Sequence, residues 1–214
     1  KRLQGVGSKM RLVPCQEGIE RRAMHTGLES LGPASNKSSS STGRDAHSKE
    51  HQHGLDPHIW LSPPLARIMA MNVRDAFVSL DPEHAAGYQN RYLQLAQEIN
   101  AVDNKLLSLF AKSKGSIFLV YHPSWGYFAE AYGLRQVPIE LEGKQPSPRE
   151  LSQLIRFAKR HSVGTIFVQP QFSQQAARTV ASSLGADLVE LDPLAEDWPS
   201  NLARAGERIA EALR

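Results

Sequence analysis

From residue 116 to residue 213, short apolar segments alternate with longer amphipathic ones, and this alternation restricts the fold more than any other feature. The apolar segments have the length and side chains of buried strands, and the amphipathic segments have helical spacing. Strands that alternate with helices form a parallel sheet covered on both faces. The chain is therefore predicted to be an α/β protein with four strands, at 116–121, 136–141, 165–170 and 186–191, and helices at 125–132, 146–161, 173–184 and 198–213.

Two of the expected helices begin with recognisable capping residues. Ser147 stands at the N-cap of the helix at 146–161, with Pro148 at the first helical position and Glu150 at the third. The serine hydroxyl and the glutamate carboxylate can each accept a backbone N–H of the first turn. Ser62 and Pro63 predict a similar start for an earlier helix.

The longest periodic segment lies between residues 82 and 111, where apolar residues recur every three or four positions. This spacing indicates one amphipathic helix. At 1.5 Å per residue, its roughly thirty residues would extend about 45 Å, so the helix could connect two bodies. We therefore divide the chain into residues 1–81, a long helix at 82–112 and an α/β unit at 113–214.

Before the first helix, the chain is mostly polar. A short strand is predicted at Met10–Val13, and the serine-rich residues 30–57 are predicted to lack fixed structure. Such a low-complexity tract buries too little apolar surface to offset the entropy lost on ordering. Residues 1–81 are thus expected to contribute one helix and a long loop.

Four histidines gather at the end of this tract, in the sequence DAHSKEHQHGLDPHIW of residues 45–60. Neutral imidazole is a common protein ligand for zinc and similar ions. We interpret His47, His51 and His53 as a loose metal-collecting tract. His58 is different, because the surrounding DPHIWLSP is apolar and predicted to be structured, so it is a candidate for a fixed site.

The overall composition excludes several classes of protein. The formal net charge of the 214 residues is +3 and the basic residues are dispersed, whereas nucleic-acid binding requires a concentrated basic face. No apolar run is long enough to span a membrane. The opening KRLQGVGSKM lacks the apolar core of a signal peptide, and the single Cys15 cannot form an intrachain disulfide.

Further candidate residues follow the predicted strands, because ligands of open parallel sheets bind beyond the carboxyl ends of the strands. His122 follows the first strand, Glu140 and Glu142 end the second, and Asp192 follows the fourth. His58, His122 and Asp192 together form a donor set suited to zinc. Of the two glutamates, Glu142 is the one nearer the tip of the strand. Glu142 is the candidate, in contact with a ligand rather than with the metal.

Each of the three proposed ligands also has a simpler interpretation. Asp192 stands before Pro193 and could initiate a turn, and His122 could cap the helix that starts near Ser124. His58 could be a loop histidine bonded to the backbone. The metal interpretation is favoured by their joint placement, since two of the three lie at strand ends where a cleft forms.

Five motifs in order resemble the zinc-specific substrate-binding proteins of bacterial ABC importers: DPHIWLSP (56–63), YHPSWGYFAEAYGL (121–134), IELEGKQPSPREL (139–151), IFVQPQFS (166–173) and LDPLAEDW (191–198). The resemblance covers residues 10–214. It implies a two-lobed fold whose lobes are joined by one rigid helix, the C-terminal lobe having a four-stranded parallel sheet. It also implies an incomplete N-terminal lobe, because most of that lobe and a first histidine ligand precede the position of Met10 in the family.

The resemblance also implies roles for individual residues. His58, His122 and Asp192 would bind the metal, and residues 25–57 would be the mobile histidine-rich loop of zinc receptors. Manganese and iron relatives usually carry a carboxylate at the position of His122, so the histidine favours zinc. A fourth ligand could come from the loop histidines, which are His25, His47, His51 and His53.

We therefore predict a periplasmic or surface-tethered receptor that captures Zn²⁺ and delivers it to the membrane permease of an ABC transporter. It is expected to be a monomer, to touch the membrane only peripherally and to catalyse no reaction. One alternative is a zinc hydrolase with Glu142 as general base, which the lack of an HExxH motif disfavours. The other is a metal-buffering or adhesin relative with no role in transport.

Overall fold

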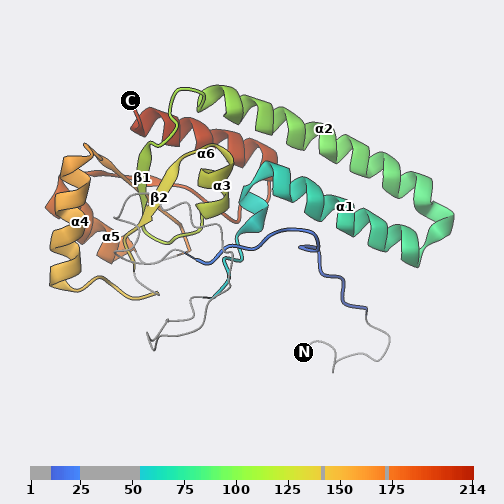
Figure 1. Ribbon diagram of the computed structural model, residues 1–214, viewed down its shortest axis with the longest axis horizontal. Helices are drawn as coiled ribbons and strands as arrows, with labels where there is room; N and C mark the ends of the chain where they lie inside the picture. The colour runs from blue at the N-terminus through green and yellow to red at the C-terminus, as the bar shows by residue number, and fades with distance from the viewer. Residues whose placement is uncertain (1–10, 25–53, 141–142, 172–173) are drawn as a thin grey trace, which may run out of the picture.

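A computed structural model of the chain describes residues 11–24, 54–140, 143–171 and 174–214 (Figure 1). The described helices are α1 (Pro63–Leu80), α2 (Ala85–Leu109), α3 (Gly126–Ala131), α4 (Pro148–Arg160), α5 (Gln174–Leu184) and α6 (Trp198–Ala212), with 3-10 turns η3 (Ile59–Leu61) and η4 (Pro82–His84). The described strands are β1 (Ile117–Val120), β2 (Arg135–Pro138), β3 (Thr165–Val168) and β4 (Asp187–Glu190).

The four strands form one sheet in the order β2-β1-β3-β4, and every neighbouring pair is parallel. The predicted α/β class and the four predicted strands are confirmed. β2 begins at Arg135, one residue earlier than predicted, because Ile117 of β1 pairs with that residue. The chain order reverses between β1 and β3, which places a topological switch point at the centre of the sheet.

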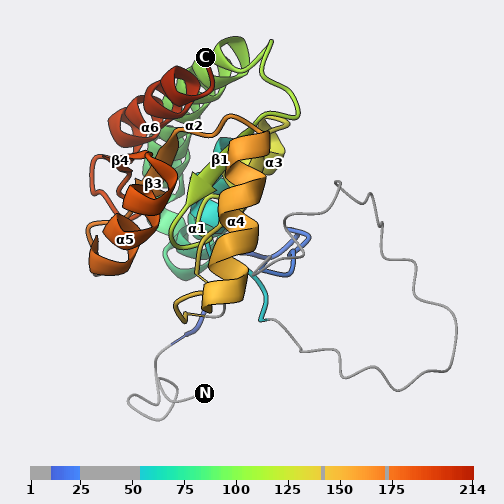
Figure 2. The same ribbon diagram turned by 90° about the vertical axis from the view of Figure 1, so that its left-hand side faces the viewer.

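Alternate residues of the strands enter two separate cores. Phe118 and Val120 of β1 face a core that includes side chains of α2, α3 and α6, whereas Leu119 faces a core built with α4 and α5. Figure 2 shows α2 and α6 side by side, apart from α4. Both faces of the central strands are therefore buried, which explains why β1 and β3 are almost entirely apolar.

The helix α2 packs against α1 at its start and against the α/β unit at its end. Near its start it packs against α1 through the stacked rings of Phe77 and Tyr88, and near its end Val102 and Leu106 are buried in the core under the sheet. Gly206 of α6 permits this close packing, because a Cβ at that position would lie 2.1 Å from Leu106 Cδ2. The end of α2 is thus part of the α/β unit.

The long helix starts later than its periodicity predicts. Pro82–His84 form the 3-10 turn η4, and the α-helix begins at Ala85. Tyr88 Oη donates to Asp81 Oδ2 (2.7 Å), and the His84 ring contacts the same carboxylate at 2.9 Å. These two contacts hold the pKa of Asp81 below its ordinary value. They fix the carboxylate at the corner between α1 and α2, where the chain reverses direction.

The segments on either side of the histidine tract differ from expectation. Residues 11–13 form no strand. Instead, Ala23 forms an antiparallel bridge with Leu55, and Asp56 N donates to Arg22 O at 2.9 Å. The unstructured tract predicted at 30–57 therefore extends too far at its C-terminal end, because Asp56 is buried and bonded to Arg22.

The two predicted helix caps have different outcomes. Ser147 and Glu150 form the complete capping box at the start of α4. Ser62 occupies the N-cap of α1 in an extended conformation, but its side chain makes no capping hydrogen bond. Among the described helices, none combines the length and the hydropathy needed to cross a lipid bilayer.

Candidate metal centre

The candidate residues of the sheet lie at its carboxyl edge. His122 comes two residues after β1, and Glu140 comes two residues after β2. Gln169 comes directly after β3, and Asp192 comes two residues after β4. Because all four strands run in parallel, these residues share one edge, and His122 lies at the switch point between β1 and β3.

The ring of His122 is held by a carboxylate from the neighbouring strand. His122 Nδ1 lies 2.5 Å from Glu140 Oε1, and the exposed fractions of the two side chains are 19% and 6%. Behind the ring, Gln169 Nε2 donates to His122 O (3.0 Å) and to Ser124 Oγ (2.8 Å). Burial, and then the nearby Glu140 carboxylate, raise the pKa of Tyr121. Backbone and ring of His122 are thus both fixed.

His58 is held in the same manner by a residue close in sequence. Asp56 Oδ1 accepts a hydrogen bond from the backbone N of His58 (2.9 Å) and lies 2.8 Å from Nδ1 of its ring. Asp56 is itself buried, and Tyr127 Oη donates to its carbonyl oxygen at 3.3 Å. The exposed fraction of the His58 side chain is 12%. A turn before η3 therefore fixes this ring, and Asp56 connects that turn to α3.

The tertiary structure brings the two histidines together. Their ring centroids lie 5.4 Å apart, with the ring planes at 77°. Two imidazoles that bind one tetrahedral zinc ion through Nε2 have ring centroids about 5 Å apart, since a Zn–N bond is about 2.1 Å long. The observed spacing therefore fits two ligands of one ion, with each Nδ1 occupied by a carboxylate.

Asp192 is on the same edge, in a turn connected to the His58 segment. Its Oδ1 accepts from Leu194 N (2.9 Å) and from Gln171 Nε2 (2.6 Å), so the alternative role of Asp192 in a turn is also observed. Trp60 Nε1 donates to Pro193 O at 2.8 Å. Within the described residues, no three histidine, cysteine or acidic side chains are grouped closely enough to hold one metal ion.

Other predicted residues lie outside the described part of the chain. These are Glu142 and the loop histidines, His25, His47, His51 and His53. The sequence analysis selected Glu142 over Glu140, but the structure shows Glu140 bonded to His122. The strand register explains this contact, since Val120 pairs with Pro138 and the pairing continues through the bond from Glu140 N to Tyr121 O (3.1 Å).

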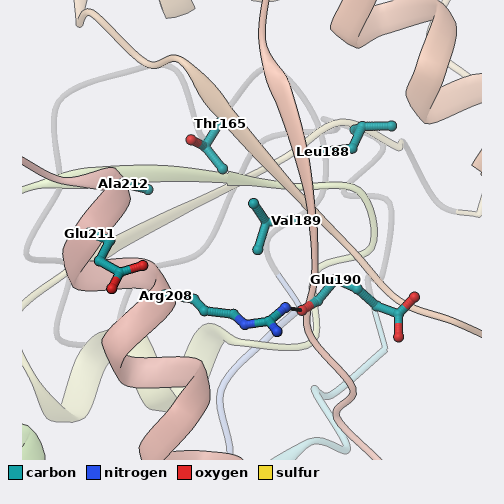
Figure 3. Close-up of a pocket in the computed structure, with 7 residues that line it drawn as sticks. All are labelled: Thr165, Leu188, Val189, Glu190, Arg208, Glu211 and Ala212. Atoms are coloured by element: carbon teal, nitrogen blue, oxygen red, sulfur yellow. Dashed lines mark hydrogen bonds between the residues drawn. The ribbon is translucent and has the colours of Figure 1, made fainter.

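A surface cavity of about 460 Å³ lies away from the histidines, beside the edge strand β4 (Figure 3). Its lining includes Val189, Glu190, Arg208 and Glu211. Arg208 Nη1 donates to Glu190 O at 2.9 Å, so this side chain covers part of the open strand edge. The cavity contains no histidine and is separate from the candidate metal centre.

A parallel α/β fold that joins two carboxylate-bonded histidines at its switch point is suited to a metal-binding protein. A family model described as "Zinc-uptake complex component A periplasmic" matches residues 8–212, and the chain belongs to this family.

Known members of the family resemble the chain over much of its length. The high-affinity zinc uptake system protein ZnuA of Bacillus subtilis is 33% identical over 144 residues, which cover 66% of this chain and 45% of the relative. The chain thus spans less than half the length of this relative. The crystal structure of a ZnuA deletion mutant with zinc bound has a TM-score of 0.83 at 32% identity, covering 99% of this chain and 72% of that one.

An adhesin is also among the similar structures. The laminin-binding protein of Streptococcus agalactiae, described as bifunctional with adhesin and metal transporting activity, has a TM-score of 0.69 at 28% identity. The match covers 75% of this chain and 65% of that chain. The fold is therefore shared between proteins named for zinc uptake and for adhesion.

Proposed function

We propose that the chain binds Zn²⁺ as a transported ion, with Nε2 of His58 and of His122 as two of the ligands. The main support is the 5.4 Å spacing of the two rings, which lie far apart in sequence and meet only in the folded chain. The zinc-bound relative and the description of the family support zinc as the metal. Imidazole nitrogen also suits zinc better than it suits manganese or magnesium.

Asp192 is the proposed third ligand. Its turn is connected to the His58 segment through Trp60, which donates to Pro193 O and accepts from Trp198 Nε1 (2.9 Å). To reach the ion, the carboxylate exchanges its hydrogen bond with Gln171 for a bond to zinc. His47, His51 and His53 are proposed as auxiliary residues that collect the ion, and Glu142 as a residue in contact with a ligand.

The proposed role of the whole protein is to capture zinc outside the cytoplasm and deliver it to the membrane permease of an ABC transporter. The family description names a periplasmic component of a zinc-uptake complex, which supports both the partner and the compartment. The protein is proposed to act as a monomer, peripheral to the membrane at most. No catalysis is proposed, because a family named for zinc uptake is a family of receptors.

The first test is a calorimetric zinc titration of this chain beside His58→Ala, His122→Ala and Asp192→Asn. We expect one strong site in the unchanged chain. Each histidine variant should lose more than about 100-fold in affinity, which is the upper range for losing a group that only supports a ligand. His84→Ala is the control, since that ring is 71% exposed and bonded to Asp81. Strong binding that survives both histidine substitutions would contradict the proposal.

The same titration at two pH values tests the role of imidazole. Zinc binds the neutral ring and displaces protons. Zinc affinity should therefore fall as the pH drops through about 6.5, the ordinary pKa of a histidine side chain. Equal affinity at pH 7.5 and 5.5 would show that histidines are not the ligands.

A further inference from the structure

Asp56 and Glu140 are the only acidic side chains that are buried among the described residues. Each of them contacts one of the two candidate histidines, and each contact is made to Nδ1. The other acidic side chains of the described segments are at least partly exposed. The burial of carboxylates is therefore confined to the candidate metal centre.

Burying a carboxylate is costly unless hydrogen bonds satisfy its oxygens. Glu140 lies within hydrogen-bond distance of the His122 ring, and Asp56 accepts from the backbone N of His58 and lies within hydrogen-bond distance of its ring. A solvated surface would provide the same charge without this cost. The position of these two carboxylates is therefore better explained by what they do to the rings.

A carboxylate at Nδ1 selects one of the two neutral forms of imidazole. It accepts a proton that Nδ1 carries, so the lone pair of the ring is left on Nε2. It also fixes the rotation of the ring and makes Nε2 a better donor to a metal. With both rings held in this way and 5.4 Å apart, both Nε2 atoms are in the form that binds zinc.

We infer that Asp56 and Glu140 are positioning residues of the zinc site, which fix the tautomer and orientation of His58 and His122 before the ion arrives. The inference rests on the proposed function for its consequence, the gain in affinity. Its structural part, the choice of tautomer, concerns the metal-free chain. Neither carboxylate is proposed to touch the ion.

The test uses Asp56→Asn and Glu140→Gln, which keep the size of each side chain and remove its charge. An amide can donate to Nδ1, and the ring would then carry its proton on Nε2, the nitrogen needed for zinc. The first measurement is the tautomer of each histidine in the metal-free chain, from long-range ¹H–¹⁵N spectra of the imidazole rings. The second is zinc affinity, from competition with a chelator of known affinity.

We expect each variant to lose the Nδ1–H tautomer at its own histidine and to retain it at the other. Zinc affinity should fall about 10- to 100-fold in each case. Glu130→Gln is the matched control, because Glu130 is a glutamate of α3 that is 70% exposed and pairs with Arg22. It should change neither measurement. Thermal unfolding of the metal-free variants shows whether each chain still folds.

Two results would overturn the inference. One is an unchanged tautomer in Asp56→Asn and Glu140→Gln. The other is a zinc affinity of these two variants that equals the affinity of the unchanged chain, as the affinity of the control Glu130→Gln should. Failure of the proposed function is seen separately, as strong zinc binding by His58→Ala and His122→Ala. The tautomers of the metal-free chain can still be measured in that case.

Discussion

His58 and His122 are held by carboxylates in the same way, but the two contacts arise at different levels of structure. Asp56 precedes His58 by two residues, and one turn of the chain makes both hydrogen bonds. Glu140 reaches His122 only because β1 and β2 are parallel neighbours in a register that pairs Val120 with Pro138. One support is local, whereas the other depends on the whole sheet.

This difference indicates which perturbations should affect each histidine. A change in the core under the sheet acts on the strands that carry His122 and Glu140. A change near α3 acts on Asp56, and hence on His58, because Asp56 packs beside Gly126. The two halves of the site should therefore respond separately to mutations that do not touch either ring.

The largest effect is expected for Leu106→Ala. Leu106 is fully buried between α2 and α6, and such truncations cost about 2–5 kcal/mol. The core that loses this side chain includes Val120, which precedes the turn to His122. Amide exchange should therefore rise more around Val120 and His122 than at His58. Urea denaturation measures the free energy of unfolding, and hydrogen exchange measures the local effect.

The neighbouring residue is a matched control for that prediction. Leu107 is 50% exposed on the same helix. Its replacement by alanine should change the free energy of unfolding by less than about 0.5 kcal/mol. Equal destabilisation by the two variants would show that α2 does not contribute to the core of the sheet as described.

A smaller effect, confined to the other histidine, is expected for Gly126→Ala. The new Cβ would lie 3.0 Å from Asp56 Oδ2 and 3.3 Å from Arg22 Cζ. Crowding of a packed site costs about 1–3 kcal/mol. The imidazole resonances of His58 should shift in NMR spectra of the metal-free chain, while those of His122 stay in place.

Gly87→Ala provides the control for that substitution. A Cβ at Gly87 would meet only Arg91 Nη2, at 3.6 Å, within α2. Alanine should stabilise this helix by up to about 1 kcal/mol through its higher propensity. If Gly126→Ala behaved like Gly87→Ala, or shifted both histidines equally, the separation of the two supports would be disproved.

The smallest effect is expected for Trp60→Phe, which acts on the link between the His58 segment and the Asp192 turn. Phenylalanine keeps an aromatic ring but loses the hydrogen bond to Pro193 O, worth about 1 kcal/mol. For a chain of this size, that corresponds to a fall in Tm of about 2–4 °C. Differential scanning calorimetry measures it, and an unchanged Tm would show that this bond does not hold the Asp192 turn.

The local features of the fold were predictable from the sequence. The four strands, the capping box of Ser147 and Glu150 and most of the long helix follow from periodicity and from side-chain patterns within a few residues. The expected strand at residues 10–13 was wrong, because a short apolar run does not show whether a pairing partner exists. The start of the long helix was missed because the Asp81 contacts were not visible in its periodicity.

The residues of the site also differ in whether the sequence could predict them. His58, His122 and Asp192 could be selected as candidates because strand ends and histidine-rich motifs are visible in the sequence. Glu140 was passed over for Glu142, which is nearer the tip of the strand, because the sequence of one strand does not specify its register with the next. Asp56 was not singled out either, although an aspartate two residues before a histidine was a signal that could have been used.

Which carboxylate meets which ring was decided by tertiary structure in one case and by a local turn in the other. The Asp56–His58 contact joins residues two positions apart, so the order of the amino acids brings the partners together, and packing beside α3 holds them in place. The Glu140–His122 contact and the 5.4 Å approach of the two rings require packed helices and a paired sheet. Contacts between distant residues depend on the free energy of the whole fold, and no local pattern encodes that quantity.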